Sequence, residues 1–452
     1  MSKKSRRSFL QKMALGMGLP FVPQMDTSQP HPLYRSLYRK TRYSPNDQIQ
    51  LALIGAGGMG NADMQTALRI PGVRMVAACD LYDGRLKQCK EVYGKDIFTT
   101  RDYREILQRD DIDGVIIGTP DHWHKQISVD ALMSGKAVYC EKPMVHHIEE
   151  GLEVVNAQRK SGKTFQVGSQ GMSSLGNEKA KELLAAGAIG TLNYAEGFWA
   201  RNSPVGAWQY AIPDDASPET VDWERYLSNT TDRPFDPLRF FRWRNYRDYG
   251  TGVSGDLFVH LFSSLHFITN SRGPNKIQAT GGLRYWKDGR EVPDVLLGMF
   301  DYPETEEHPP FNLSLRVNFV DGTSGSTYLR LVGSEGAMDV KWREVVLRKN
   351  EAVDPNADPF LAQKSEEKGQ AVPTYQRKKI KGPQEIVYQA EDDYLGAHYD
   401  HLYNFIQGIR TGKQVAEDAV FGFRAAAPAL LCNDSYFENK IINWDPDKMK
   451  VL

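Results

Sequence analysis

The chain has little of what marks membrane, disulfide-rich or nucleic-acid-binding proteins. No stretch approaches the roughly 20 apolar residues of a membrane span, and the mean hydropathy is −0.51. Only four of the 452 residues are cysteines, and their spacing suits neither a zinc site nor a disulfide framework. Lysine and arginine total 56 against 57 acidic residues, so no positive excess favours nucleic acid. We expect a globular protein with buried thiols, no stable membrane span, no metal site and no nucleic-acid partner.

The N-terminus resembles an export signal. Residues 1–24 (MSKKSRRSFLQKMALGMGLPFVPQ) join a basic start to a short, weakly apolar stretch that is too short for a membrane anchor. Residues 5–10 (SRRSFL) resemble the twin-arginine signal, whose translocon carries folded proteins. We expect residues 1–30 to contain this signal and the start of a linker, which continues over residues 31–47. The expected location is the periplasm, or the cytoplasm if the signal is not functional.

Residues 48–168 alternate short apolar runs with helix-like stretches. The predicted strands are residues 49–55, 74–80, 114–119 and 137–141. The predicted helices are residues 61–70, 103–108, 124–134 and 148–160. Continuous apolar strands that alternate with helices are typical of a doubly wound parallel sheet, so we expect an α/β domain here.

Residues 169–452 show a different pattern, with β-rich runs and few helices between them. Predicted strands cover residues 192–199, 276–281, 296–302, 313–319 and 326–332, and two helices are expected over residues 399–409 and 417–436. The polar stretch 351–385 reads as a solvated insertion. We expect an α+β domain with a large, mostly antiparallel open sheet.

A glycine turn follows the first predicted strand and opens a helix. It consists of Gly55, Ala56, Gly57, Gly58, Met59 and Gly60. The first glycine of this G-x-G-x-x-G pattern permits a tight turn, the second lets backbone approach a pyrophosphate, and the third allows close helix packing. Asp80 lies twenty residues after Gly60, where a carboxylate accepts hydrogen bonds from ribose hydroxyls. Together they predict a Rossmann domain that binds NAD, while nearby Arg85 keeps NADP as the less favoured alternative.

Two further strand ends carry candidate site residues. Thr119, Pro120 and His124 stand at a strand–helix junction, where His124 could cap or pack the helix or could contact a ligand. Glu141 and Lys142 follow the last predicted strand of the domain. A lysine at the carboxyl edge of a parallel sheet can hydrogen-bond a substrate hydroxyl and assist proton transfer, although a surface lysine is the alternative.

The glycine turn, residues 119–124 and Glu141-Lys142-Pro143 together resemble the Gfo/Idh/MocA family of glucose–fructose oxidoreductase and inositol dehydrogenase relatives. The resemblance spans residues 48–445 and includes residues 404–413 (NFIQGIRTGK). It implies a Rossmann domain and an α/β domain whose open sheet often packs against another subunit, so we expect a homodimer or homotetramer. It also implies that the cofactor is bound by residues 55–60, Asp80, Thr119, Pro120, His124, Glu141 and Lys142.

The resemblance gives a meaning to Asp256 and His260, which lie four residues apart and share a face if this stretch is helical. Relatives that dehydrogenate polyols carry D-x-x-x-H here, with the histidine as base and the aspartate as its orienting partner. Lys142, Asp256 and His260 would then surround the carbinol carbon. Without the resemblance, an apolar-flanked histidine is more typical of a packed core.

Aromatic and arginine residues of the second half are candidate substrate contacts, because aromatic faces stack on pyranose C–H surfaces and arginine binds hydroxyls or carboxylates. We expect Arg242 and Trp243 to bind substrate together with Lys142, Asp256 and His260. Trp199, Arg201 and Trp208 are further candidates, and packing is the alternative for each. The sequence Gln170-Gly171-Met172 departs from the family pattern, since many relatives carry a basic residue here.

Three functions fit these patterns. The favoured one is an NAD-dependent oxidoreductase that acts on a hydroxyl of a small-molecule sugar, glycoside or polyol. The second is a redox-neutral glycosidase or lyase that oxidises a ring hydroxyl transiently, and the third is a non-catalytic sugar-binding protein. Because a periplasm has no ready pool of NAD, an exported enzyme must carry its cofactor with it.

Overall fold

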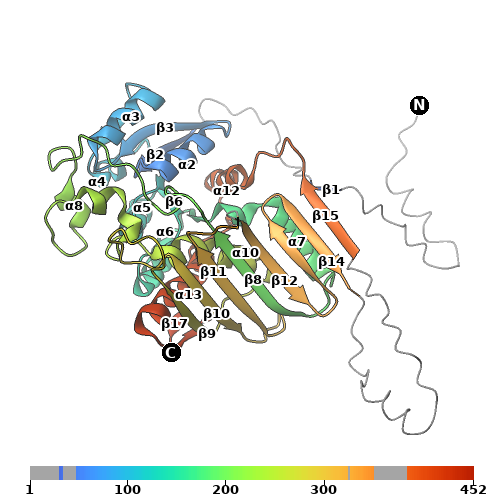
Figure 1. Ribbon diagram of the computed structural model, residues 1–452. Helices are drawn as coiled ribbons and strands as arrows, with labels where there is room; N and C mark the ends of the chain where they lie inside the picture. Colours follow the sequence, from blue (N-terminus) through green and yellow to red (C-terminus); the bar gives the residue numbers. More distant parts are fainter. Residues whose placement is uncertain (1–29, 34–46, 324–325, 351–383) are drawn as a thin grey trace, which may run out of the picture.

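The computed structural model describes residues 30–33, 47–323, 326–350 and 384–452, which form two sheets with helices packed around them (Figure 1). Nearly all of the predicted export signal, residues 34–46 of the predicted linker and most of the predicted insertion lie outside the described residues. No helix in the described ranges is both long enough and apolar enough to span a bilayer.

The first domain contains a parallel sheet, which the described residues build from six strands in the order β4-β3-β2-β5-β6-β7. The strands are β2 (Ile49–Ile54), β3 (Val73–Cys79), β4 (Phe98–Thr100), β5 (Gly114–Ile117), β6 (Ala137–Glu141) and β7 (Phe165–Gly168). The helices are α2 (Gly58–Leu68), α3 (Asp83–Tyr93), α4 (Tyr103–Leu107), α5 (His124–Met133) and α6 (Gly151–Ser161), with 3-10 turns η2 (Asp121–Trp123) and η3 (Ile148–Glu150). The predicted doubly wound sheet is confirmed. Its strand order reverses between β2 and β5, where ligands bind in such folds.

Two elements of this domain escaped the sequence pattern, α3 and β4. Helix α3 buries only Cys89 among its residues, so it carries no apolar stripe. Strand β4 has three residues, which is too short for a visible run. All four cysteines are buried and free, as their spacing predicted.

The second sheet has eleven strands in the described part of the chain, ordered β1-β15-β14-β13-β12-β8-β11-β10-β9-β16-β17. The strands are β1 (His31–Leu33), β8 (Leu192–Ala200), β9 (Lys276–Gly282), β10 (Val295–Tyr302), β11 (Phe311–Asn318), β12 (Thr327–Gly333), β13 (Gly336–Lys341), β14 (Glu344–Lys349), β15 (Gln384–Ala390), β16 (Ile442–Asp445) and β17 (Lys450–Val451). Neighbours run antiparallel except β8–β11 and β1–β15. The predicted, mostly antiparallel sheet is confirmed.

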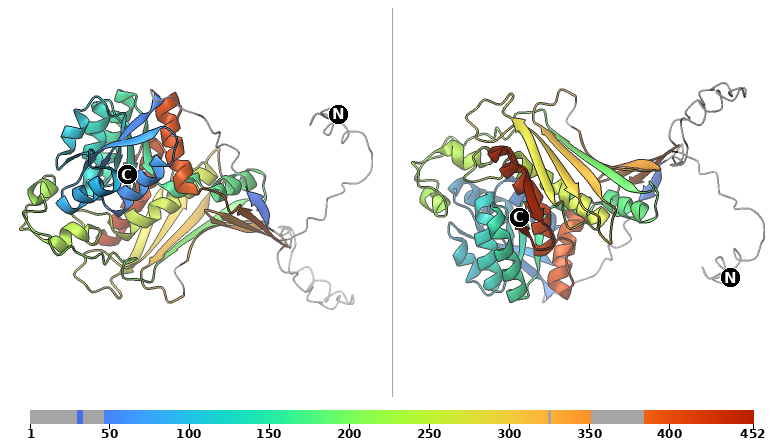
Figure 2. Two further views of the ribbon diagram at one scale, coloured as in Figure 1. Left: turned by 90° about the horizontal axis from the view of Figure 1, so that it is seen from above. Right: turned by 90° about the horizontal axis from the view of Figure 1, so that it is seen from below.

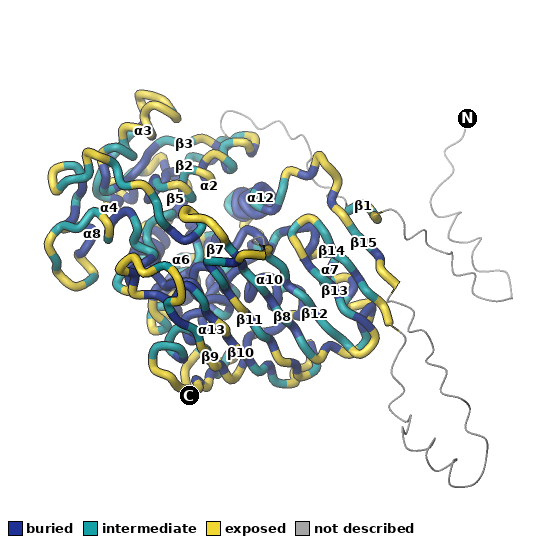
Figure 3. Tube along the Cα trace, in the orientation of Figure 1, coloured by how far each residue is buried: buried dark blue, intermediate teal, exposed yellow. Residues whose placement is uncertain are grey.

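One face of this sheet is covered and the other is open. Helices α7 (Leu175–Ala185), α10 (Val259–Thr269) and α13 (Ala419–Glu438) lie on the face toward the first domain, and α12 (Ala397–Thr411) packs against α2 (Figure 2). Burial alternates along the central strands β10 and β11, as expected for a sheet with one solvated face (Figure 3). The open face is the one that the family resemblance associates with subunit contact.

Strands at the far edge of the sheet differ from the sequence expectation. Residues 31–33, expected in a linker, form β1 by adding to the edge of β15, a pairing that no local pattern reveals. Strand β15 begins at Gln384, inside the segment expected to be an insertion. Strands β13 and β14 were missed because both contain charged residues, which take the half-buried or exposed positions.

Between β8 and α10, the chain leaves the second sheet and packs on the first domain. We call residues 201–253 the covering segment; it contains α8 (Trp223–Leu227), α9 (Pro237–Phe241) and the 3-10 turn η5 (Trp243–Asn245). A small hydrophobic cluster joins Tyr82 of the first domain to Val221, Trp223 and Phe241 of this segment. The π-helical turn η6 (Ser254–Phe258) then leads directly into α10.

Candidate active site

A cavity of about 590 Å³ lies along the carboxyl edge of the parallel sheet, between the two domains. The glycine turn and Asp80 line one end, which we call the cofactor end. Lys142, Asp256 and His260 line the other, which we call the substrate end. The structure therefore places both sets of predicted site residues on one cavity.

The glycine turn has the shape that a dinucleotide requires. Gly55 has φ +90°, and a Cβ there would lie 2.5 Å from the backbone nitrogen of Thr119. A Cβ at Gly60 would lie 2.2 Å from the Gly55 carbonyl oxygen. At Gly58, by contrast, a Cβ would meet nothing within 4 Å, so open space lies over the N-terminus of α2. No side chain caps this helix, which leaves its first N–H groups free for a pyrophosphate.

Asp80 follows β3 and lines the cofactor end of the cavity. Its Oδ2 accepts a hydrogen bond from the Ala56 backbone N–H (2.8 Å), and its Oδ1 accepts one from the Tyr82 N–H (3.0 Å). The carboxylate therefore fixes the glycine turn as well as facing the predicted ribose position. Arg85 lies 3.4 Å from Asp80 and also lines the cavity.

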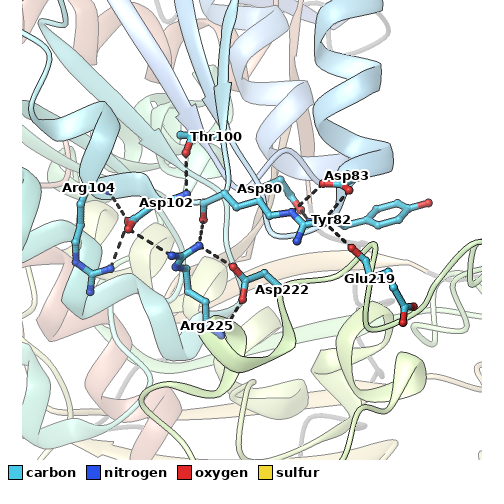
Figure 4. A network of polar contacts seen from close by, with 10 residues as sticks. Asp80, Tyr82, Asp83, Thr100, Asp102, Arg104, Glu219, Asp222 and Arg225 are labelled. Atoms are coloured by element: carbon cyan, nitrogen blue, oxygen red, sulfur yellow. Dashed lines mark hydrogen bonds and ion pairs between the residues drawn. The ribbon is translucent and has the colours of Figure 1, made fainter.

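The covering segment binds the first domain beside Asp80, as Figure 4 shows. The Asp222 N–H donates to the Leu81 carbonyl (2.8 Å), and the Asp83 N–H donates to the Thr220 carbonyl (3.0 Å). Tyr82 donates its hydroxyl hydrogen to Asp215. Backbone bonds between the two domains thus pass next to the cofactor end.

Arginines reinforce this junction from both sides. Arg101 donates to the Glu219 carbonyl (3.0 Å), and Arg225 donates to the Arg101 carbonyl (3.3 Å). Arg225 also pairs with Asp222 at 2.7 Å and with Asp102 at 3.5 Å (Figure 4). The cofactor end is therefore walled by two domains rather than one.

His124 has a structural position. Its ring is buried, and its nitrogens lie 2.7 Å from the Pro143 carbonyl and 3.0 Å from the Thr119 carbonyl. Burial alone would lower its pKa, but Cys140, Asp121 and the Pro143 carbonyl raise the pKa of His124 to about 10. A protonated ring can donate to both carbonyls at once. Thr119 and Pro120 line the cavity whereas His124 does not, so His124 joins two cavity-lining loops from behind.

Glu141 lines the cavity with a buried carboxyl group in front of Asp63 of α2. Gln170 donates to Glu141 (2.5 Å) and to Asp63 (3.4 Å). Burial and the adjacent Glu141 raise the pKa of Asp63 well above its usual range. The two neighbouring buried carboxyl groups therefore favour the protonated form of Asp63.

Lys142 and Asp256 meet at the substrate end. The Lys142 Nζ donates to the Asp256 Oδ1 at 2.7 Å and to its carbonyl oxygen at 2.8 Å. The Arg244 Nε donates to the same Oδ1 at 3.1 Å. Although burial opposes it, Lys142 and Arg244 hold the pKa of Asp256 far below its usual range, so this carboxyl stays ionised.

His260 lies one helical turn beyond Asp256 but has different partners from those the D-x-x-x-H pattern implies. Its ring stacks on Trp199, with centroids 5.2 Å apart and planes inclined by 26°. Its Nδ1 is buried and finds no hydrogen-bond partner in the described part of the chain. Burial and Lys142 lower the pKa of His260 well below its usual value, so the ring is neutral. Asp256 orients Lys142 and Arg244 rather than His260.

The remaining substrate candidates divide into two groups. Trp199, Arg201, Trp208 and Trp243 line the cavity, as do Gly57, Gly58 and Met59 at the cofactor end. Arg242 is not among the lining residues, because it donates to the Tyr210 carbonyl (2.8 Å) and to Gln209 (2.5 Å). Arg242 therefore anchors the covering segment, and its predicted substrate contact is not supported.

Sequence reasoning missed four lining residues at the substrate end: Tyr210, Arg244, Trp342 and His398. Arg244 is two positions from the predicted Arg242, and the η5 turn decides which arginine enters the cavity. Trp342 comes from the tip of the β13–β14 hairpin, which no motif marked. A Cβ at Gly171 would lie 2.4 Å from the Trp342 Nε1, so the indole fills the space that a side chain at position 171 would occupy.

Comparison with known proteins agrees with this geometry for the first domain. Residues 49–169 match the model of the GFO_IDH_MocA oxidoreductase family, described as an NAD-binding Rossmann fold. The inositol 2-dehydrogenase of Rubrobacter xylanophilus is 31% identical over 162 residues, which cover 35% of this chain and 46% of that protein. A glycosyl hydrolase family 109 protein of Shewanella sp. strain ANA-3 is 36% identical over 118 residues, covering 24% and 26% respectively. The chain thus spans less than half the length of these curated relatives.

The overall fold also has solved counterparts. A levoglucosan dehydrogenase in complex with NADH and levoglucosan superimposes with a TM-score of 0.63, covering 88% of this chain and 99% of that one. The sequence identity is 16%, so this likeness concerns the fold. Residues 49–169 are an NAD-binding Rossmann domain, followed by an α+β domain of the kind found in such proteins.

Proposed function

We propose that this chain, whose residues 49–169 match the NAD-binding domain of the Gfo/Idh/MocA oxidoreductases, is a dehydrogenase acting on a hydroxyl of a sugar, glycoside or polyol. One observation carries the proposal. Lys142, Asp256 and His260 line the same cavity as the glycine turn, and tryptophans surround them. Similarity to an inositol 2-dehydrogenase and the fold of levoglucosan dehydrogenase support this assignment.

Lys142 is positioned to bind the hydroxyl that is oxidised. When NAD⁺ is bound, it supplies a hydride acceptor at the carboxyl edge of the sheet. An ammonium has three N–H donors, and the side chain and carbonyl oxygen of Asp256 occupy two of those of Lys142. The third can donate to a substrate oxygen and stabilise negative charge that develops on it.

His260 can take the proton that the hydroxyl loses. Its ring is neutral at working pH because burial and Lys142 lower its pKa. Asp256 remains ionised beside Lys142 and Arg244, so it holds both cations in place without itself taking up a proton. The tryptophans would orient the sugar ring and exclude water from the reacting carbon.

A redox-neutral glycosidase or lyase is the second candidate. The identity to a glycosyl hydrolase family 109 protein favours it, as does the covering segment that walls the cofactor end. A cofactor held by two domains exchanges slowly, which suits a cycle that oxidises and then reduces the same substrate.

The decisive experiment starts with the purified protein. Bound nucleotide is first measured by chromatography of the released ligand. The protein is then incubated with a panel of sugars, polyols and aryl glycosides while absorbance at 340 nm and released aglycone are followed. Net NADH formation supports the dehydrogenase, and aglycone release without NADH supports the redox-neutral enzyme. Sugar binding without either signal identifies a binding protein and overturns both proposals.

We also propose that the protein is exported folded through the twin-arginine translocon with NAD in place. The motif SRRSFL in residues 5–10 supports this. Bound ligand stabilises a folded domain by about 4 kcal/mol when free ligand is ~1,000 times its dissociation constant. Cell fractionation of the native protein and an Arg6→Lys, Arg7→Lys variant tests the proposal. Cytoplasmic native protein, or periplasmic protein without nucleotide, would contradict it.

The open sheet face is our proposed subunit contact. Leu297 and Met299 of β10 are 44% and 55% exposed on the sheet. Light scattering after size exclusion should give a dimer or tetramer, and a Leu297→Glu, Met299→Glu variant should shift it toward monomer. A monomeric native protein would contradict this contact.

A further inference from the structure

A second, smaller cavity adjoins the substrate end. Its volume is about 290 Å³, close to the lower limit of about 300 Å³ for small-molecule sites. Trp199, His260 and Trp342 line both cavities, so the two spaces meet at these three rings. A ligand that extends from Lys142 into the second cavity would have to pass these rings, and the residues that line this cavity lie outside the covering segment.

Three aromatic rings lie at the boundary between the two cavities. Trp199 stacks on one side of the His260 ring, and the centroid of the Trp342 ring lies 6.5 Å from it. The backbone of the hairpin tip is joined to α7 at Trp342, whose carbonyl accepts a hydrogen bond from the Gly176 N–H (3.2 Å). Fixed aromatic faces of this kind bind the apolar face of a sugar ring at little entropic cost.

The second cavity also has buried polar groups with unused hydrogen-bonding capacity. Asn177 and Ser264 line it and are 1% and 5% exposed. The Asn177 amide donates to the Gly171 carbonyl and to the Ser264 Oγ, both at 2.9 Å. This leaves the Asn177 Oδ1 as an acceptor and the Ser264 hydroxyl hydrogen as a donor, with no partner in the described ranges. A ligand that supplies hydroxyls could therefore form hydrogen bonds with both groups.

We propose that this cavity is a subsite for the second ring of a glycosidically linked sugar, whose first ring is oxidised beside Lys142. The proposal rests on the proposed function and specifies its substrate as a disaccharide or longer glycoside. Hydroxyls of the second ring would bind Asn177 and Ser264, and its C–H face would stack on Trp199 or Trp342.

Activity toward matched substrates tests the subsite. We expect kcat/KM for a disaccharide to exceed that for its own monosaccharide by about tenfold, the effect of roughly one good hydrogen bond plus stacking. Ser264→Leu places apolar volume into the cavity and should remove this advantage while leaving the monosaccharide within about threefold. Ser264→Ala should lose part of the advantage. Ser134→Leu, an exposed change at the end of α5 that lines neither cavity, is the matched control.

Binding gives a readout independent of turnover. Tryptophan fluorescence of the NAD-loaded protein should titrate with the disaccharide about tenfold more tightly than with the monosaccharide, and Ser264→Leu should abolish the difference. Equal affinities for both sugars, equal losses for both in Ser264→Leu, or a preference only for aryl aglycones would overturn the subsite. If no sugar reduces NAD but the disaccharide preference in binding persists, the proposed function fails and the subsite stands.

Discussion

The two ends of the main cavity are built in different ways. At the cofactor end, one short turn and one strand end supply the site, and most contacts available to a ligand are backbone N–H groups. At the substrate end, side chains arrive from β6, β8, the covering segment, η6, α10 and a hairpin tip. A backbone site needs glycines at fixed spacing, so it can be read from the sequence. A site made of side chains from distant segments depends on the whole fold.

The difference also concerns charge. Asp80 at the cofactor end accepts two backbone N–H bonds and tolerates a single nearby arginine. Asp256 at the substrate end neutralises two cations, Lys142 and Arg244. Removing Asp256 would leave two half-buried cations without their carboxylate, which is more costly than losing a surface pair.

The largest effect should come from the substrate end. Lys142→Ala and His260→Ala should each lower kcat by ~10²-fold or more, the usual scale for general acid–base groups. Nucleotide content should stay nearly unchanged, because both residues lie at the substrate end of the cavity while the glycine turn and Asp80 are intact. Stopped-flow or steady-state assays with nucleotide analysis of the same samples separate the two quantities. Full activity in His260→Ala would assign that ring to packing.

A change at the cofactor end should instead remove the bound nucleotide. Gly57→Val introduces a side chain where the backbone must approach the pyrophosphate, and bound NAD should be lost. The apoprotein should remain folded, since a Cβ at Gly57 meets nothing closer than 3.9 Å. Circular dichroism checks the fold and chromatography measures nucleotide. Native nucleotide content in this variant would remove the glycine turn from the site.

The free energy of unfolding should depend on pH through a buried carboxyl group at the boundary between the domains. Glu417 is buried, accepts a hydrogen bond from Ser263 (2.8 Å), and burial raises its pKa to about 8. Above an unfolded pKa near ~4.3, the native state holds a proton that the unfolded state has lost. Stability should therefore fall as pH rises from about 5 to 8, by at most ~1.4 kcal/mol per pH unit. Glu417→Gln removes this contribution. The melting temperature of the variant, relative to that of the native protein, should therefore increase as pH rises. Parallel pH profiles would contradict the shift.

The smallest expected effect tests whether Trp342 contacts the substrate. A Cβ at Gly171 would lie 2.4 Å from the Trp342 indole, so Gly171→Ala must displace that ring. We expect KM for sugars to rise about threefold to tenfold with kcat nearly unchanged, because Lys142 and His260 keep their places. Unchanged KM, or loss of kcat alone, would show that Trp342 does not contact substrate.

Sequence reasoning located the elements that carry the site better than the contacts within it. The glycine turn, Asp80 and Lys142 lie where strand ends predicted them, because the carboxyl edge of a parallel sheet is fixed by topology. Arg242 was chosen over Arg244, since a 3-10 turn rather than a regular period sets which one faces inward. Trp342 could not be found, because its place depends on the pairing of β13 with β14 and on the missing side chain of Gly171. The partner of Asp256 was wrong for a related reason: four residues apart on a helix implies a shared face, not a hydrogen bond.

The first domain ends near residue 168 in the sequence, but the covering segment, which comes later in the chain, packs against it in space. A fragment that ends at Gly168 would contain every strand of the parallel sheet, yet Tyr82 would lose the cluster around Val221 and Phe241. Leu81 and Asp83, which follow β3, would also lose their backbone hydrogen bonds with Asp222 and Thr220. The two domains should therefore unfold as one cooperative unit, and proteases should find no susceptible hinge near residue 168. Folding of the nucleotide site would then have to wait for residues synthesised after the sheet itself is complete.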